Sequence, residues 1–340
     1  MTATHVDERA ARDHDAPQRD TDAAYAGLEP RNIVITVTPA DRIFRALAGG
    51  VGSFSLFIVG ATALFLFIKA RPAMQHAGWI GFFTHSVWNN ANGNFGVYGL
   101  LVGTVLIAAI ALTIAVPISL ATAIFINEYA PGRVRRLLVS AIDLLAALPS
   151  LIFGLWGLFA LEKYLIGPSK WMGSHLSAIP IFQFTSVQPS LSRSVFIAGV
   201  VVGLMIIPVV TSVSRDVMAQ VPRELCEGAL ALGGTRWGMV RQVILPFGRS
   251  GIVGAALLGF GRALGETIAV ALILSMSPQV NWHVLETNGG SIAGWIATQF
   301  GEANSVGRSG LIAAGLALFM LTLTVNATAR VIVKRTTRYT

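Results

Sequence analysis

Glu227-Gly-Ala-Leu-Ala-Leu-Gly233, followed by Leu245-Pro246, lies in a basic segment between two strongly apolar parts of the chain. Pro222 precedes this stretch and suits the first turn of a helix, because the N–H that proline lacks would have no partner there. Residues 223–232 then predict a helix, and Gly233 can adopt the left-handed conformation that ends it. The stretch therefore predicts a helix that lies on a membrane face between two spans.

A second helix is expected directly after this one. Thr235 is a suitable N-cap residue, since its hydroxyl can accept a hydrogen bond from the first turn. We expect this helix to run to about Leu245 and Pro246 to stop it, because proline has no N–H to donate. Residues 214–250 are thus predicted to form a helical hairpin. A plain connecting loop is the alternative, but fewer residues would join the two spans at a lower entropic cost. The apolar surface that the hairpin would offer to a groove in a partner comprises Ala229, Leu230 and Leu232.

The composition is that of a membrane protein. Of 340 residues, 54% are hydrophobic and only 12% are charged, whereas soluble domains carry about 25% charged residues. The net charge of +8 comes from basic residues scattered between apolar runs, which excludes the clustered basic face of a nucleic-acid-binding protein. Cys226 is the single cysteine, so no intrachain disulfide and no multi-cysteine metal site are expected.

Six apolar stretches are long enough for helices that cross a bilayer, since a span needs about 20 residues. The alternation of a β-barrel is absent, and the sequence predicts an all-α membrane domain over residues 40–335. Residues 1–39 mix acidic and basic side chains without an early apolar region, so we expect a disordered cytoplasmic tail and no signal peptide. The expected spans are 47–68, 98–126, 137–161, 195–213, 251–275 and 310–333.

The basic residues around these spans predict the orientation. With the N-terminus inside, eighteen Lys and Arg residues fall on the inner side and six on the outer side. Loops retained in the cytoplasm are enriched in Lys and Arg. Both termini and residues 214–250 are therefore expected in the cytoplasm.

No catalytic residues are expected in this chain. It contains no Gly-x4-Gly-Lys-Ser/Thr phosphate loop, no His-Glu-x-x-His and no Gly-x-Ser-x-Gly, which are the sequence signals of ATP binding, zinc proteolysis and serine hydrolysis. The energy for transport must therefore come from another polypeptide.

Arg262 and Glu266 fall inside the fifth expected span, four residues apart and so on one face of a continuous helix. Placing an arginine at the bilayer centre costs about 3 kcal/mol, whereas an i,i+4 ion pair contributes only about 0.2–0.5 kcal/mol. A polar cavity is therefore required, and charges in a membrane indicate a solute pathway. A structural pair that locks helices together is the alternative. Asp143, in the third span, could contact Arg135 or Arg136, or approach Arg262.

The hairpin resembles the EAA loop of ABC importer permeases through Glu227, Ala229, Gly233 and Leu245-Pro246, although Gly228 replaces the second alanine. The block Arg262-Ala-Leu-Gly-Glu-Thr-Ile-Ala-Val270 resembles a signature of phosphate-specific ABC permeases. Asp143-Leu-Leu-Ala-Ala-Leu-Pro-Ser150 and Gly154-Leu-Trp-Gly-Leu-Phe159 are similar to the third span of the same family. Ser291-Ile-Ala-Gly-Trp-Ile-Ala297 is similar to one of its external segments. Together they resemble the C-type subunit, PstC, over residues 40–335.

This resemblance implies a type I ABC importer permease with six transmembrane helices in a prokaryotic plasma membrane. Its partners would be a second, A-type permease subunit, two ATPase subunits that bind ATP and Mg²⁺, and an extracytoplasmic phosphate-binding protein. The chain itself would carry no cofactor. Arg262 would attract phosphate and Glu266 would accept a hydrogen bond from its protonated oxygen. The residues implied to couple to the ATPase are Glu227, Gly228, Ala229, Gly233, Leu245 and Pro246.

Two other functions remain open from the sequence. A permease for another oxyanion, such as sulfate or molybdate, would have the same hairpin, and only the pathway residues would differ. An autonomous channel or a secondary carrier would leave the hairpin without a purpose and would transport without an ATPase.

Overall fold

The computed structural model describes residues 38–89 and 93–337, and its side chains as far as Val331. The expected tail, 1–39, lies almost wholly outside the described residues. The chain divides into two compact units at Val59 and Gly60, within helix α2 (Pro39–Ala77). The second unit holds the helices from α3 to α14.

Six helical stretches of the described chain are long and apolar enough to cross a membrane, which confirms the all-α fold with six spans. They cover Pro39–Ala77, Tyr98–Tyr129, Ser150–His175, Val195–Met218, Arg236–Leu264 and Ser305–Val331.

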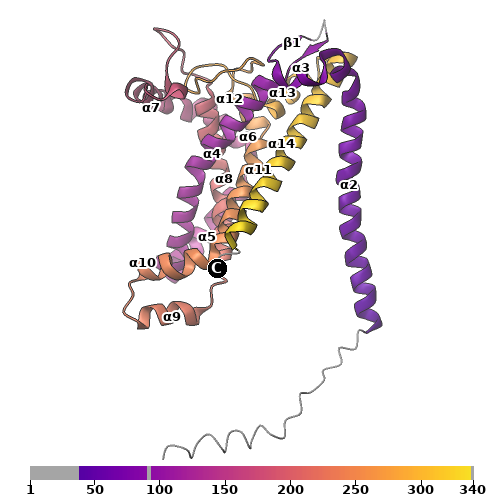
Figure 1. Cartoon of the computed structure of the whole chain (residues 1–340). Coiled ribbons are helices and arrows are strands. Elements are labelled where there is room, and N and C mark those ends of the chain that lie inside the picture. Colours follow the sequence, from indigo (N-terminus) through magenta and orange to yellow (C-terminus); the bar gives the residue numbers. More distant parts are fainter. Residues whose placement is uncertain (1–37, 90–92, 338–340) are drawn as a thin grey trace, which may run out of the picture. The chain divides into compact units, whose positions relative to one another are not determined.

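Helices α4 (Tyr98–Ile124) and α8 (Val195–Met218) form the centre of the second unit, and α11 (Leu245–Leu264) packs beside them (Figure 1). Gly199 and Gly203 lie where α8 meets α4. A Cβ at Gly199 would stand 2.7 Å from the Cβ of Ile110, so only glycine permits this close approach. Ser119 adds a hydrogen bond from its hydroxyl to the carbonyl oxygen of Ile207, at 3.0 Å.

The third span differs from the expected range 137–161. Helix α5 (Gly132–Ala147) ends at Leu148, which is extended, and Pro149 precedes α6 (Ser150–Trp156). Steric conflict with the proline ring keeps the preceding residue out of the helical region, so Pro149 separates two helices instead of kinking one. A π-helical segment, Gly157–Leu161, leads on to α7 (Glu162–His175). The span is therefore Ser150–His175, and α5 is a separate helix that contacts α8.

The end of the bundle away from α9 and α10 is closed by short elements: α3 (Trp79–Thr84), β1 (Trp88–Asn89), β2 (Asn94–Phe95), a 3-10 turn at Pro180–Phe182 and α13 (Ile292–Gln299) (Figure 1). The rings of Trp88 and Trp295 meet there with centroids 5.9 Å apart. Helix α14 (Ser305–Thr337) runs back along the bundle and packs on α11 and α13. A Cβ at Gly103 of α4 would overlap the carbonyl oxygen of Gly290, so α4 and the 277–290 loop touch backbone to backbone.

Candidate functional site: an arginine-lined cavity and a helical hairpin

The predicted hairpin is present at one end of the bundle as α9 (Arg223–Ala231) and α10 (Arg236–Met239) (Figure 1). Gly233 has a φ of 85°, which confirms the predicted left-handed end of the first helix. The hydroxyl of Thr235 accepts a hydrogen bond from the N–H of Gly238 at 3.0 Å, which confirms the predicted cap. Pro222 stands at the N-cap position, one residue before the expected first turn.

The prediction that Pro246 stops the second helix is wrong. The helix continues from α10 through a π-helical segment, Val240–Ile244, directly into α11, where Pro246 is the second residue. A π turn shifts the hydrogen-bond pattern by one residue, and a proline in a first turn needs no donor. The widened turn therefore removes the conflict that would otherwise break the helix, and residues 236–264 form one span.

The hairpin has an inner and an outer face. Cys226 and Ala229 pack inward against a buried apolar cluster that includes Met218, Val240 and Ile244. Ala229 is half-exposed and also lines a surface pocket with Gly228 and Leu232, so it contacts both the cluster and the outer surface. Leu230 and Leu232 do face outward, and Leu232 is 91% exposed. Glu227 and Gly228 are exposed as well. Burial, followed by the nearby carboxylates of Glu128 and Glu227, raises the pKa of the Cys226 thiol.

Arg262 and Glu266 do not share a helix face, contrary to the prediction. Helix α11 ends at Leu264, and α12 (Ile268–Ile273) begins after a break at residues 265–267. Glu266 is 9% exposed, and its Oε1 accepts a hydrogen bond from the N–H of Ala269 at 3.2 Å. A carboxylate at this position satisfies a free donor of the first turn and complements the helix dipole. Arg262 thus ends one helix while Glu266 holds the start of the next.

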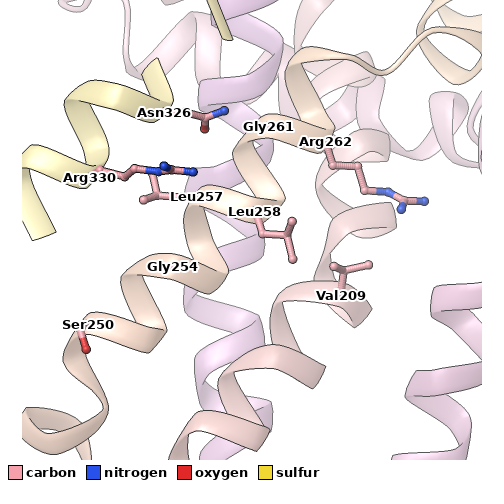
Figure 2. Close-up of a pocket in the computed structure, with 9 residues that line it drawn as sticks. All are labelled: Val209, Ser250, Gly254, Leu257, Leu258, Gly261, Arg262, Asn326 and Arg330. Atoms are coloured by element: carbon pink, nitrogen blue, oxygen red, sulfur yellow. The ribbon is translucent and has the colours of Figure 1, made fainter. Parts of the chain in front are cut away.

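Arg262 lines a cavity of about 850 Å³ between α8, α11 and α14. Figure 2 shows its guanidinium projecting from α11, while Arg330 extends from α14 toward Leu257. Glu266 is not among the lining residues. The full lining is Val209, Ser250, Gly254, Leu257, Leu258, Gly261, Arg262, Asn326 and Arg330.

Asp143 lies exposed on α5. Within the described residues it forms no ion pair with Arg135, Arg136 or Arg262; the pair found there is Arg215 with Asp216, at 3.0 Å. The structure thus separates Asp143 from the cavity.

Arg330 and Asn326 are polar lining residues on α14 that the sequence did not predict. Arg330 was counted only as a basic residue at the inner end of the last span, where such residues are common. The available signal was the spacing of Asn326 and Arg330, four residues apart and hence on one face of a helix.

Comparison with known proteins gives consistent results. Residues 115–338 match the family described as "binding-protein-dependent transport system inner membrane component". The chain is 39% identical over 311 residues to the phosphate transport system permease protein PstC 2 of Mycobacterium tuberculosis, covering 89% of this chain and 96% of that protein. It is 41% identical over 297 residues to the PstC protein of Mycobacterium leprae, covering 86% and 92%.

Two solved ABC transporters share the fold. The chain resembles a bacterial transporter that imports the polysaccharide alginate, with a TM-score of 0.54, 14% identity and coverage of 86% of this chain and 99% of that chain. It also resembles the MetNI methionine transporter in an inward-facing conformation, with a TM-score of 0.50, 16% identity and coverage of 70% and 96%. At these identities the likeness concerns the fold alone.

Proposed function

The chain belongs to the PstC family of phosphate transport system permeases, and on that premise we propose how its geometry serves phosphate import. It is a permease subunit of a phosphate importer, and the single observation that carries this function is the 39–41% identity to named phosphate permeases over 86–89% of the chain. The fold supplies the spans, and the arginine-lined cavity supplies a place for an anion among them.

Arg262 receives the phosphate ion in this proposal. Its guanidinium presents paired N–H donors that match two oxygens of a tetrahedral anion. Within the described chain it has neither an ion pair nor a hydrogen bond from its side chain, so the donors are available to a ligand. A guanidinium at membrane depth is costly unless water or an anion meets it, which the cavity allows.

Glu266 accepts a hydrogen bond from a protonated oxygen of the same phosphate. Its Oε1 takes the N–H of Ala269, which fixes the carboxylate and leaves Oε2 for the substrate. Sulfate is fully deprotonated near neutral pH and has no proton to donate. In this proposal the break at residues 265–267 brings the Glu266 carboxylate toward the anion during transport. Arg262 and Glu266 together then select phosphate over sulfate.

The hairpin couples this pathway to a separate ATPase subunit. Leu232 and Glu227 point outward, where an apolar groove with basic groups would receive them. Gly233 keeps the turn compact, whereas a Cβ at Gly228 would meet nothing within 4 Å, so packing within the chain does not require glycine there. Leu245 and Pro246 connect the hairpin to α11. Ala229 supports the hairpin from its inner face.

The complete transporter contains, in this proposal, a second permease subunit of the A type, two ATPase subunits that bind ATP and Mg²⁺, and an extracytoplasmic phosphate-binding protein. The chain contributes half of the pore and binds no cofactor itself. Both termini and the hairpin face the cytoplasm of a prokaryotic cell, following the bias of basic residues.

Uptake of radioactive phosphate by the assembled transporter in liposomes tests the pathway. Arg262→Ala removes charge-assisted hydrogen bonds worth about 1.5–3 kcal/mol, so uptake should fall at least about tenfold. Arg262→Lys keeps the charge and should retain part of the rate. The ATPase subunit should co-purify with both variants. Phosphate uptake by Arg262→Ala at the wild-type rate would contradict the proposed pathway.

A further inference from the structure

We propose that Arg330 and Asn326 of α14 form a second binding station for a phosphate-type anion, in the same cavity as Arg262 and nearer to the coupling hairpin. The inference rests on the proposed function, because it extends the pathway from one arginine to two. It assigns a ligand-binding role to a residue whose position near a helix end would otherwise be explained by membrane orientation alone.

The placement of Arg330 is the first argument. Asn326 and Arg330 are one turn apart on α14 and both line the cavity. Figure 2 shows the Arg330 guanidinium directed at α11 beside Leu257, not along α14 toward its end. Leu257 precedes Arg262 by five residues, which is about 8 Å along a helix. Arg330 therefore reaches into the cavity at a level between Arg262 and the hairpin.

The charge of the cavity is the second argument. Its lining contains two arginines and neither aspartate nor glutamate. Within the described part of the chain, Arg330 has no ion pair, and its side chain has no hydrogen-bond partner. An arginine that only reached the membrane surface would gain by pointing to water or headgroups. The lining thus offers Arg330 no carboxylate partner, which favours an anion at its guanidinium.

The third argument is the open space along α11 on both sides of Arg330. Gly254 and Gly261 line the cavity on α11, and a Cβ at either position would meet nothing within 4 Å. Ser250 continues this small-residue surface toward the hairpin. Side chains of ordinary size on this surface would occupy the space in front of Arg330. The cavity is thus unfilled along this surface of α11.

The chemistry of the station points to a phosphate group. A guanidinium fork donates two parallel hydrogen bonds to two oxygens of such a group, and the side-chain amide of Asn326 offers a further donor. Free phosphate and the headgroup of a phospholipid share this chemistry. The experiment must therefore separate the transported ion from a lipid.

Cysteine accessibility in the assembled transporter makes this distinction. Cys226→Ser removes the only thiol of this chain, and Ser250→Cys places a reporter in the exposed part of the cavity lining. The rate of reaction with a negatively charged methanethiosulfonate is measured with and without inorganic phosphate, in vesicles of pure phosphatidylcholine and in vesicles that contain phosphatidylglycerol. Arg330→Gln and Arg330→Lys are compared with Arg249→Gln, a neighbouring exposed arginine that lines a different pocket.

Phosphate should slow the labelling of Ser250→Cys about tenfold in phosphatidylcholine vesicles. One charge-assisted contact changes an equilibrium constant by about this factor. Arg330→Gln should abolish this protection, Arg330→Lys should retain part of it, and Arg249→Gln should retain it fully. Phosphate protection that persists in Arg330→Gln would overturn the proposal. Protection that depends on phosphatidylglycerol and not on phosphate would assign the site to a lipid and also overturn it.

The outcome is separable from that of the proposed function. Loss of uptake in Arg262→Ala together with unchanged protection in Arg330→Gln refutes the second station and leaves the pathway at Arg262 intact. Wild-type uptake in Arg262→Ala refutes the pathway itself, whatever Arg330 does.

Discussion

Glu266 should be needed twice, once for the start of α12 and once for phosphate, and two substitutions separate these roles. Glu266→Ala removes the acceptor of the Ala269 N–H in a site that is only 9% exposed. Glu266→Gln keeps an acceptor of nearly the same shape but removes the charge. The first variant therefore perturbs fold and pathway together, and the second perturbs mainly the pathway.

The hydrogen-bond geometry sets the expected magnitudes. A buried donor left without a partner costs about 1–3 kcal/mol, and loss of a helix-capping side chain costs about 0.5–2 kcal/mol. We expect Glu266→Ala to lower the free energy of unfolding by about 2 kcal/mol, which corresponds to about 3 °C in Tm for a chain of this length. Glu266→Gln should cost about 1 kcal/mol, the difference between a charged and a neutral acceptor. Both should reduce phosphate uptake at least about tenfold.

Thermal unfolding of the purified complex and phosphate uptake in liposomes are measured on the same preparations. Glu302→Gln, at an exposed glutamate beyond α13, is the matched control and should change neither quantity. Wild-type uptake by Glu266→Gln would show that the carboxylate serves only α12. An unchanged Tm in Glu266→Ala would show that the hydrogen bond to Ala269 contributes no stability.

Three further predictions follow from packing, titration and exposure. Gly103→Ala should lower Tm, because the new Cβ overlaps the carbonyl oxygen of Gly290 and overpacking costs about 1–3 kcal/mol. Gly132→Ala is the control and should leave Tm unchanged, since a Cβ there meets nothing within 4 Å. An equal loss of Tm in both variants would contradict the packing argument. The rate at which iodoacetamide alkylates Cys226 should rise with pH only above the ordinary thiol pKa of about 8.5. Burial and nearby carboxylates raise the pKa of this thiol and keep the reactive thiolate scarce at lower pH. A pH midpoint of the alkylation rate at or below about 8.5 would refute the raised pKa. Leu232→Ser should leave the free energy of unfolding within about 0.5 kcal/mol of wild type, since the side chain is 91% exposed. The same variant should reduce co-purification of the ATPase. Full co-purification would exclude Leu232 from the docking surface.

The sequence predicted the features that depend on local chemistry. Six apolar stretches became six spans, Thr235 caps a helix with its own hydroxyl, and Gly233 adopts the left-handed backbone that its missing Cβ allows. Each of these follows from the residues within one or two turns. Arg262 was likewise identified as a membrane-embedded charge that requires a cavity, and it lines one.

The errors fall where packing between distant segments decides the backbone. A glycine inside a helix costs only about 1 kcal/mol relative to alanine, so Gly265 alone did not predict a helix break. The break is stabilised by the hydrogen bond from Ala269 to Glu266 and by the contacts of α12 with α6. Pro246 gave the opposite error, because a π turn absorbed the residue that local rules treat as a stop. Arg330 was missed because only the approach of α14 to α11 turns a basic helix end into a cavity wall.

The two backbone irregularities around α11 together suggest how the hairpin acts on the pathway. Arg236–Leu264 is one helical span of 29 residues, about 43 Å long at 1.5 Å per residue, and it carries α10 at one end and Arg262 at the other. The break lies beyond Arg262, and Glu266 is hydrogen-bonded to α12 instead. We infer that displacement of α10 by the ATPase changes the separation of Arg262 and Glu266. Spin labels at the exposed positions Trp237 and Ser250 should therefore keep their distance through the ATP cycle, whereas labels at Ser250 and Ile268 should not. A changing distance in the first pair would place the joint at Pro246 and contradict this inference.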